Sequence, residues 1–502
     1  MFIKNWDELG QEQHRARQGA ILHRFLKEQV LKYSPFYIDL FKSKGLTADD
    51  IRTVDDLHKI PFTAKADIAP TRENPEKPRR LVLQPDKDTY VSTISVGKKY
   101  SLLQEMVLTG RSIKDQVLDE YLPIFFIATT GRTANPTPFL YSERDLRYFR
   151  EASRRVFTIA GARRETDFAL SAFPYAPHLA FWIVYQGGIV TGTPMFHTGG
   201  GRVFGTDRIV PAIQRYGATI VVGIPGYVYH VLRLASERGI DCSKVRLVVL
   251  GAERVTVSLK RRLKEMLESM GAKNPVILST FGFTEARVAW TECPNENSTE
   301  VSYGYHLYPD MEIFEIIDPE SGHVLSDGES GEVVYTALDW RGSVVLRYRT
   351  GDYAKGGITW LKCPGCGRRV ARLSTDITRL SDHGELQLSK VKGTLVNFNE
   401  FYPILSGHDG VIEWQVEITK RNGDPYELDE IHIYAAVRPD IDRDRLVEEL
   451  RKVVRERMEL DITEVHFLNP DEMAVRLGMD DRPKEMRIVD RRSEFAPKEG
   501  GG

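Results

Sequence analysis

The chain has 502 residues, of which 69 are Lys or Arg and 71 are Asp or Glu, so its formal net charge is −2. A chain of this length exceeds one ordinary hydrophobic core, and we expect two or more domains. The balance of charge excludes a chain-wide attraction to nucleic acid or to an anionic membrane, so we expect no nucleic-acid partner.

The N-terminal segment and the number of cysteines indicate in which cellular compartment we expect the protein. Residues 1–18 lack the apolar core of a signal peptide, and no uninterrupted apolar run is long enough to cross a bilayer. We therefore expect a cytoplasmic protein without a membrane span. Four cysteines are too few for a disulfide scaffold in a chain of this size, which favours metal binding or free thiols.

Short apolar runs alternate with amphipathic stretches between residues 124 and 279. This pattern is typical of an α/β fold with a buried, mainly parallel sheet. The runs are IFFIAT, FALSAF, ATIVVGI, VRLVVLG and PVILST. The segment SLKRRLKEMLESM predicts a helix that covers the sheet, because its apolar residues follow helical spacing: Leu259, Leu263, Met266, Leu267 and Met270.

The pattern changes twice in the second half of the chain. Alternating apolar and polar residues predict a β-rich section at residues 311–352, with glycine-rich turns between the strands. After about residue 380, the runs IEWQVEI, EIHIYAAV and EVHFL and the helical segment DRLVEELRKVVRERM predict a separate small α+β domain. Residues 493–502 are polar and end in three glycines, so we expect a disordered tail.

A loop rich in hydroxyl groups follows the run IFFIA. It consists of Thr129, Thr130, Gly131, Arg132, Thr133, Ala134, Asn135, Pro136 and Thr137. Small residues in such a loop leave backbone N–H groups and hydroxyls free to point at phosphate oxygens. A threonine-rich surface turn has a similar sequence, so this segment alone leaves both interpretations open.

Two further turns follow buried strands. They are Gly251-Ala252-Glu253 and Phe281-Gly282-Phe283-Thr284-Glu285. Because strand ends form the binding crevice of an open α/β sheet, we expect these turns and the hydroxyl-rich loop to converge on one ligand. Phe281 would stack on a base, Thr284 would bind a phosphate, and Glu285 would hold Mg²⁺. Each residue alone is more often an ordinary turn residue.

The segment RYRTGD, residues 347–352, closes the β-rich section and places the Asp352 carboxylate on a turn. This carboxylate can accept two hydrogen bonds from ribose hydroxyls, although an aspartate after a glycine is also common in turns. Nearby, Cys363-Pro-Gly-Cys366 has the spacing with which two thiolates bind one metal ion, and Cys293 and His306 would complete four ligands. The alternative is a tight turn with free thiols.

These segments resemble the adenylate-forming ligase superfamily, in particular its phenylacetate-coenzyme A ligase branch. The phosphate loop of that family is similar to Ser-Ser-Gly-Thr-Thr-Gly-Lys-Pro-Thr, its acidic turn to Tyr-Gly-Leu-Thr-Glu, and its ribose motif to RYRTGD. Three other segments are similar to this branch: Tyr33–Tyr37, Ile60–Asp67 and Lys484–Arg492. The resemblance spans Ser34 to Arg492, apart from an apparent insertion at about residues 80–120 whose role the sequence leaves open.

The resemblance implies the acyl-adenylate synthetase fold. An N-terminal AMP-binding domain would comprise residues 1–380, with a zinc subdomain at about residues 293–366, and a mobile C-terminal α+β lid domain would comprise residues 381–492. The zinc would be structural. The family's hinge is similar to Gly-Arg-Ser-Asp-Asp-Met, whereas this chain has Ser381-Asp382-His383-Gly384-Glu385-Leu386. In the phosphate loop, Arg132, Ala134 and Asn135 replace the threonine, glycine and lysine of the family.

The resemblance also implies a role for each motif. Residues 129–137 would hold the triphosphate of ATP, Gly251–Glu253 with Phe281 and Gly282 would border the adenine, and Asp352 would bind the ribose. Glu285 would assist Mg²⁺. Lys484 is similar to the catalytic lysine of the family, whose charge stabilises the negative charge that builds up between the carboxylate oxygen and the α-phosphorus. The acid pocket would include Tyr175, His178, Phe181 and Tyr227, together with Trp182, which indicates an aryl or otherwise apolar acid.

The implied reaction has two steps. A carboxylic acid attacks ATP and forms an acyl-AMP with release of pyrophosphate, and a thiol then displaces AMP. The thiol would belong to coenzyme A or to the phosphopantetheine arm of an acyl carrier protein, and relatives of this branch are often homodimers. Two alternatives stay open: an adenylyltransferase that stops at the AMP stage, and a weakened scaffold that binds nucleotide or acyl ligand. The altered loop and hinge permit the second.

Overall fold

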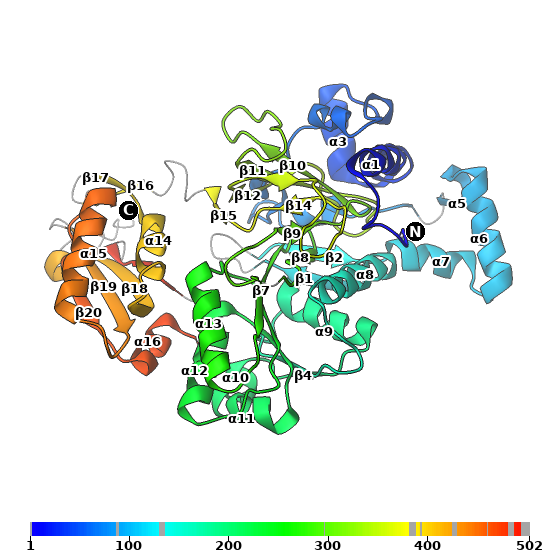
Figure 1. Ribbon diagram of the computed structural model, residues 1–502. Coiled ribbons are helices and arrows are strands. Elements are labelled where there is room, and N and C mark those ends of the chain that lie inside the picture. Colours follow the sequence, from blue (N-terminus) through cyan, green and yellow to red (C-terminus); the bar gives the residue numbers. More distant parts are fainter. Residues whose placement is uncertain are drawn as a thin grey trace. The chain divides into compact units, whose positions relative to one another are not determined.

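The computed structural model describes residues 3–86, 90–129, 136–295, 297–380, 388–391, 394–423, 429–458, 460–479 and 486–492 (Figure 1). The chain forms two compact units, each built from separate stretches of sequence. The first unit comprises Met1–Asp167, Tyr175–Met195 and Leu278–Ile377, and the second comprises Phe168–Pro174, Phe196–Ile277 and Thr378–Gly502. Strands β4 (Met195–His197), β7 (Val276–Phe283) and β15 (Ile377–Arg379) lie where the chain passes from one unit to the other.

The helices of the first unit come mainly from its N-terminal stretch. They are α1 (Gln11–Phe25), α2 (Leu31–Tyr33), α3 (Pro35–Lys44), α4 (Lys65–Ile68), α5 (Tyr90–Thr93), α6 (Val96–Thr109), α7 (Ile113–Tyr121), α8 (Glu143–Ile159) and α9 (Leu179–Thr191). Helix α8 begins after Ser142, whose hydroxyl accepts the backbone N–H of Asp145, while the Asp145 carboxylate accepts the backbone N–H of Ser142. This reciprocal capping satisfies two N–H groups that a helix start leaves unpaired.

The apparent insertion at residues 80–120 consists mainly of helices α5, α6 and α7, drawn in light blue in Figure 1. Lys98 of α6 forms an ion pair of 2.8 Å with Glu120 of α7. Helix α6 exposes apolar side chains at helical spacing, and those of Val96 and Val107 are 81% and 80% exposed. The region is therefore a small helical element, which the sequence had left without a structural interpretation.

The β-rich section that the sequence predicts is confirmed. Strands β10 (Glu312–Ile317), β11 (Gly331–Ala337) and β12 (Tyr348–Ala354) form antiparallel neighbours in the first unit. A smaller sheet joins β13 (Ile358–Thr359), β14 (Arg372–Leu373) and β9 (Tyr305–His306). Both glutamates of β10, Glu312 and Glu315, are buried, so the alternating sequence of this strand does not separate a core face from a solvent face.

The second unit contains the parallel strands that the apolar runs predict. Strands β3 (Ala169–Ser171), β5 (Ile220–Gly223) and β6 (Leu247–Leu250) are parallel neighbours. Helices α10 (Gly201–Phe204) and α11 (Thr206–Tyr216) precede β5, α12 (Pro225–Glu237) connects β5 to β6, and α13 (Val257–Ser269) follows β6. Helix α13 is the predicted covering helix, and it buries Leu263 and Leu267.

One strand of the predicted parallel sheet was wrongly assigned. Strand β1 (Phe125–Ala128), from the run IFFIAT, pairs antiparallel with β2 (Pro138–Tyr141) in the first unit. The pairing is local because only residues 129–137 separate the two strands, and antiparallel neighbours need no crossover helix. An apolar run alone does not distinguish such a hairpin strand from a central parallel strand.

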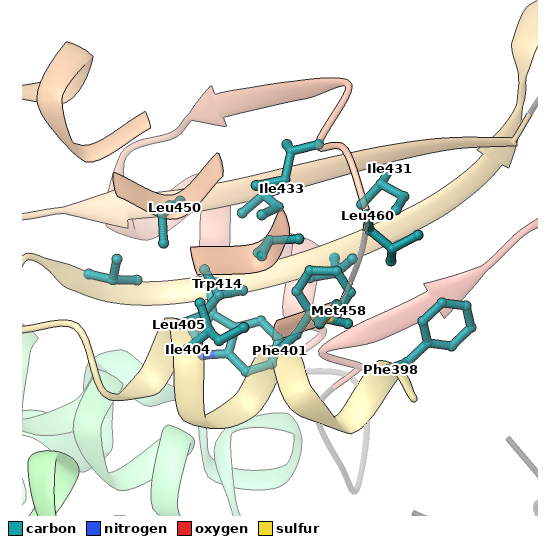
Figure 2. Packing of buried hydrophobic residues seen from close by; sticks show 14 of the residues in the cluster. Phe398, Phe401, Ile404, Leu405, Trp414, Ile431, Ile433, Leu450, Met458 and Leu460 are labelled. Carbon is teal, nitrogen blue, oxygen red and sulfur yellow. The ribbon is translucent and has the colours of Figure 1, made fainter. Parts of the chain in front are cut away.

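The C-terminal stretch forms a sheet with its own hydrophobic core. Its elements are β16 (Leu388–Val391), β17 (Thr394–Asn397), α14 (Phe401–Ser406), β18 (Val411–Lys420), β19 (Asp429–Val437), α15 (Arg443–Met458), β20 (Glu464–Phe467), α16 (Pro470–Leu477) and β21 (Ile488–Asp490). The sheet has the order β20-β19-β18-β21, with an antiparallel pair at its centre and parallel pairs at both edges. Figure 2 shows Ile431 and Ile433 of β19 pointing into the core with Leu450 of α15. The predicted α+β elements are thus confirmed.

Within the described ranges, no helix combines the length and the apolar character that crossing a membrane requires.

Candidate active site

The hydroxyl-rich loop joins the two strands of the β1–β2 hairpin. The backbone N–H of Thr129 donates to the carbonyl of Thr137 at 3.1 Å, and the backbone N–H of Thr137 donates to the Thr129 hydroxyl at 3.0 Å. The Thr137 hydroxyl is buried and has no hydrogen-bond partner among the described residues. The base of the loop is therefore closed, while the predicted ligands Thr130, Gly131, Arg132 and Thr133 lie outside the described residues.

An aromatic group lies beside the base of this loop. The ring Nδ1 of His178 donates to the carbonyl of Ala128 at 3.2 Å, and the backbone N–H of Ala128 donates to the carbonyl of Pro177 at 2.8 Å. The ring of Tyr175 lies 5.2 Å from that of Phe181. Three of the four predicted pocket residues, Tyr175, His178 and Phe181, thus follow one another in a short segment that is hydrogen-bonded to the end of β1.

The fourth predicted pocket residue, Tyr227, lies in the second unit near the predicted adenine segment. Tyr227 is in the first turn of α12, and its hydroxyl lies 2.9 Å from the Thr206 hydroxyl. Gly251 follows β6, and its backbone N–H donates to the carbonyl of Gly223 at the end of β5. Ala252, with φ of 74°, and Glu253 come next in the turn. Because β5 and β6 are parallel, both predicted segments emerge from the same edge of the sheet.

The segment Phe281–Glu285 was only partly predicted correctly. Strand β7 continues through Phe283 and pairs antiparallel with β8 (Val288–Thr291), so Phe281 and Gly282 lie in a strand and the turn begins at Thr284. The Phe281 ring stacks against Trp290, with centroids 5.8 Å apart. Apolar cross-strand pairs of this kind lengthen the ladder, which the short apolar run VILST does not reveal.

Contacts from two directions hold the turn that carries Glu285. The Tyr348 hydroxyl donates to the Glu285 carboxylate at 2.9 Å. Two residues further along the turn, Arg287 has φ of 62°, and its backbone N–H donates to the carbonyl of Thr284 at 3.2 Å. The buried Arg287 guanidinium lies over the Trp340 ring at 3.9 Å. The turn that carries Thr284 and Glu285 is therefore anchored in the core.

Asp352 does not lie on a turn, contrary to the sequence prediction. It is buried within β12, next to a bulge where the register with β11 shifts. Gly351 has φ of 70°, a conformation that a bulge requires and that glycine adopts without strain. The backbone N–H of Asp352 donates to the Thr350 hydroxyl at 3.0 Å. The bulge interrupts the regular pairing of β12 with β11, and for this reason the sequence RTGD is similar to that of a turn.

Two segments noted only for their resemblance support this strand. Thr63, from the segment IPFTAKAD, bonds on both sides of Tyr348: its N–H donates to the Arg347 carbonyl, and its carbonyl accepts the N–H of Arg349. The hydroxyl of Tyr37, from the segment YSPFY, accepts the backbone N–H of Leu346 at 2.7 Å. Tyr37, Thr63, Arg287 and Tyr348 are thus positioning residues that no pattern in the sequence singled out.

The four candidate metal ligands come together in the first unit. Cys293, His306, Cys363 and Cys366 present donor atoms that all lie within 4.8 Å of one another. Cys293 Sγ is 3.6 Å from Cys363 Sγ, and Cys366 Sγ is 3.2 Å from His306 Nε2. None of the cysteines forms a disulfide. Hydrogen bonding from Cys293 lowers the pKa of the Cys363 and Cys366 thiols, while the same contacts with these two residues raise the pKa of Cys293.

Several predicted features lie outside the described residues. They are Lys484, the hinge segment Ser381–Leu386 and the tail at residues 493–502. The first unit also contains a cavity of about 540 Å³ that is lined, among others, by Arg15, Phe62, Glu312 and Trp360. None of the predicted site residues lines it, so its volume has no bearing on the nucleotide or acyl site.

Comparisons with known proteins agree with these motifs. The AMP-binding enzyme family matches residues 56–337, more than half of the chain. The phenylacetate-coenzyme A ligase of Thermus thermophilus is 26% identical over 394 residues, which cover 76% of this chain and 74% of that protein. The phenylacetate-coenzyme A ligase of Escherichia coli is 24% identical over 383 residues, which cover 75% and 72% of the two chains.

A solved structure confirms the predicted fold. The 2-hydroxyisobutyryl-CoA ligase, in its postadenylation state with R3-HIB-AMP, superimposes with a TM-score of 0.73 at 18% sequence identity. The match covers 98% of this chain and 92% of that chain. The fold is therefore that of the acyl-adenylate synthetases. By these sequence motifs, this fold and the family match, the chain belongs to the AMP-binding enzyme family of adenylate-forming ligases, in its phenylacetate-coenzyme A ligase-like branch.

Proposed function

We propose that the protein is an AMP-forming acid–CoA ligase. A carboxylate oxygen of the acid attacks the α-phosphorus of ATP, and the bond to pyrophosphate breaks. The sulfur of coenzyme A then attacks the acyl carbon, and AMP leaves with the oxygen that came from the acid. The observation that carries this proposal is the link between two motifs: Tyr348 bonds to Glu285, and Asp352 lies in the same strand as Tyr348.

Different residues of the chain act on different parts of ATP in the first step. Asp352 accepts hydrogen bonds from the ribose hydroxyls, and the loop at residues 129–137 surrounds the phosphates. Glu285 holds Mg²⁺, which offsets phosphate charge when bound. Lys484, carried by the lid domain at residues 381–492, stabilises the charge that develops at the α-phosphorus. In the second step the lid domain rotates and gives the thiol access to the acyl carbon.

The aromatic group favours an aryl acid. Tyr175 and Phe181 lie edge to face with interplanar angle 86°, and Trp182 packs against Phe181 with centroids 5.3 Å apart. Aromatic walls retain a flat ring by burial and by edge-to-face contacts. The similarity to ligases named for phenylacetate points to the same class of substrate.

A structural zinc ion fits the Cys293, His306, Cys363 and Cys366 cluster. Three sulfurs and one imidazole nitrogen are a common donor set of closed tetrahedral zinc sites. The turn between the last two cysteines contains Gly365, where a Cβ atom would lie 3.2 Å from Cys293 Sγ. The absence of a side chain there lets the turn approach the other ligands. This zinc would hold the turn at residues 363–366 against β9.

The proposal is tested by following pyrophosphate and AMP release from Mg·ATP over a panel of aryl and aliphatic acids, with and without coenzyme A. We expect acid-dependent pyrophosphate release, an acyl-CoA product, and loss of both in Lys484→Ala but not in Lys452→Ala, an exposed lysine of α15. Acyl transfer only to a carrier protein would revise the acceptor. Retention of AMP on the product would indicate an adenylyltransferase, and nucleotide binding without turnover would indicate a scaffold; either result would overturn the ligase proposal.

A further inference from the structure

A second group of metal-ligand side chains lies on the C-terminal sheet and includes none of the candidate site residues of the nucleotide, acyl or cysteine sites. It consists of His432, Glu464 and His466, whose donor atoms lie within 4.8 Å of one another. His432 belongs to β19, and Glu464 and His466 belong to the edge strand β20. The strands are parallel, with His432 opposite Glu464 and Tyr434 opposite His466.

The sheet register brings these side chains to one face. Figure 2 shows Ile431 and Ile433 pointing into the hydrophobic core, so His432 between them points to the other face. Glu464 and His466 are two residues apart in β20 and therefore also share a face. The exposed fractions of the His432, His466 and Glu464 side chains are 16%, 29% and 61%, so an ion can reach them from solvent.

The distances fit ligands of one ion. His432 Nδ1 lies 3.1 Å from His466 Nε2, and His466 Nε2 lies 3.6 Å from the Glu464 carboxylate. Two imidazole nitrogens that bind one tetrahedral zinc at 2.0 to 2.1 Å are separated by about 3.3 Å. A hydrogen bond between the two imidazoles has a similar separation, and the experiment below distinguishes the two arrangements.

The surroundings orient both histidine rings. The Glu430 carboxylate lies 3.5 Å from Nε2 of His432 and is itself bonded by Arg421 at 3.0 Å. A carboxylate at Nε2 holds the ring proton there, which leaves the Nδ1 lone pair directed at His466. The His466 ring stacks on Tyr434, with centroids 4.5 Å apart and an interplanar angle of 17°. Both ligand rings are thus held before an ion binds.

We propose that His432, His466 and Glu464 form a second metal site, which binds a divalent transition ion such as Zn²⁺. Imidazole nitrogens and one carboxylate select this class of ion over Mg²⁺ or Ca²⁺, which prefer sites made of oxygen ligands. Three protein ligands leave a coordination position open to water. The bound ion fastens the edge strand β20 to β19, and the site acts independently of the ligase function and of the cysteine cluster.

The test is calorimetric titration of the full-length protein with Zn²⁺, after its tightly bound metal has been measured. Wild type should bind one equivalent that His466→Ala does not bind, and Glu464→Gln should bind it at least tenfold more weakly. His323→Ala and Glu456→Gln alter an exposed histidine and an exposed glutamate elsewhere and should leave this equivalent unchanged.

The glutamine variant keeps the test decisive if His466→Ala fails to fold, because the Glu464 side chain is largely exposed. Zinc should also raise the thermal midpoint of wild type more than that of Glu464→Gln at the same ion concentration. Equal zinc binding in wild type and Glu464→Gln would contradict the proposal. So would the absence, in wild type, of any binding beyond that of a folded His466→Ala variant.

Discussion

Tyr348 connects two predicted motifs through a single hydrogen bond. Its hydroxyl donates to Glu285, the residue proposed to hold Mg²⁺. In Tyr348→Phe the carboxylate loses this donor while the ring stays in place, and a hydrogen bond of this kind contributes about 1 kcal/mol. We expect kcat/KM for Mg·ATP to fall about fivefold to tenfold, with a higher Mg²⁺ requirement, in a pyrophosphate-release assay.

Tyr100→Phe is the matched control, because Tyr100 lies on α6 and is 70% exposed. It should leave the Mg²⁺ dependence unchanged. If Tyr348→Phe showed the wild-type Mg²⁺ requirement at equal stability, Tyr348 would not position Glu285 for the metal.

Glu312 predicts a pH dependence of stability. Burial raises its pKa to about 8, although the backbone N–H of Tyr308 and the indole N–H of Trp290 both donate to it. The folded chain therefore holds a proton that the unfolded chain releases between pH 4.5 and about 8. Since the unfolded state binds fewer protons, the free energy of unfolding should fall by about 1.4 kcal/mol per pH unit across this window.

Glu312→Gln removes this titration. Calorimetric melting at pH 5.5 and 8.5 should show the midpoint of wild type falling relative to that of Glu312→Gln as pH rises. Glu105→Gln, at an exposed position of α6, should follow wild type. Parallel pH profiles for wild type and Glu312→Gln would show that Glu312 is ionised in the folded state.

At the scale of elements, strand β12 is fastened to the N-terminal stretch by Arg347. The Nε and Nη2 groups of Arg347 both donate to the buried Glu315 carboxylate at 3.0 Å, and its Nη1 donates to the carbonyls of His58 and Ile60. Arg347→Ala leaves the Glu315 charge buried and unpaired. We expect a loss of about 3–5 kcal/mol in the free energy of unfolding, measured by denaturant titration.

Replacing both partners distinguishes the free-energy cost of a buried, unpaired Glu315 charge from the contribution of the Arg347–Glu315 ion pair to stability. The double variant Arg347→Met/Glu315→Leu should lose less stability than Arg347→Ala, because neither side chain is then left charged. Arg369→Ala, at an exposed arginine, should stay close to wild type. If the double variant were less stable than Arg347→Ala, the unpaired Glu315 charge would not be the main cause of the stability loss in Arg347→Ala.

The cysteine cluster predicts a metal dependence of the β9 region. Cys363→Ala removes one of four ligands, so the purified variant should lose its zinc and melt at a lower temperature than wild type. Cys242→Ala changes the fourth cysteine, which lies outside the cluster in the second unit, and should keep one zinc per chain. The measurement is metal content by mass spectrometry; equal zinc in both variants, or none in wild type, would refute the site.

At the scale of the whole molecule, periodicity predicted the elements better than their pairing. The helix at residues 257–269 and strands β18, β19 and β20 of the C-terminal sheet follow directly from apolar spacing, whereas β21 was not predicted. The same signal misplaced β1, because the choice between a hairpin and a parallel sheet depends on contacts that no local pattern contains. Glu312 and Glu315 illustrate the same limit. Trp290 bonds to Glu312 across 22 residues of sequence and Arg347 bonds to Glu315 across 32, so these contacts exist only in the folded chain.

The candidate site was predictable where chemistry is concentrated in short segments. The spacing of the cysteines indicated a cluster that the fold does assemble. The resemblance singled out the segment RYRTGD, although Asp352 lies in strand β12 and not on the predicted turn. The supporting roles of Tyr37, Thr63 and Tyr348 could not be predicted although their segments were noted, because their hydrogen-bond partners lie far away in sequence and only the fold brings them together. His432 and His466 were likewise overlooked, because only the parallel register of β19 and β20 brings them together.

The central claim is that the acid becomes joined to AMP through its own carboxylate oxygen. The most direct measurement supplies phenylacetate labelled with ¹⁸O in the carboxylate, together with Mg·ATP and coenzyme A, and determines the mass of the AMP released. We expect one ¹⁸O atom in the AMP phosphate for each acyl-CoA formed, and no labelled AMP with Lys484→Ala. Unlabelled AMP, or ADP and labelled inorganic phosphate, would contradict the adenylate mechanism.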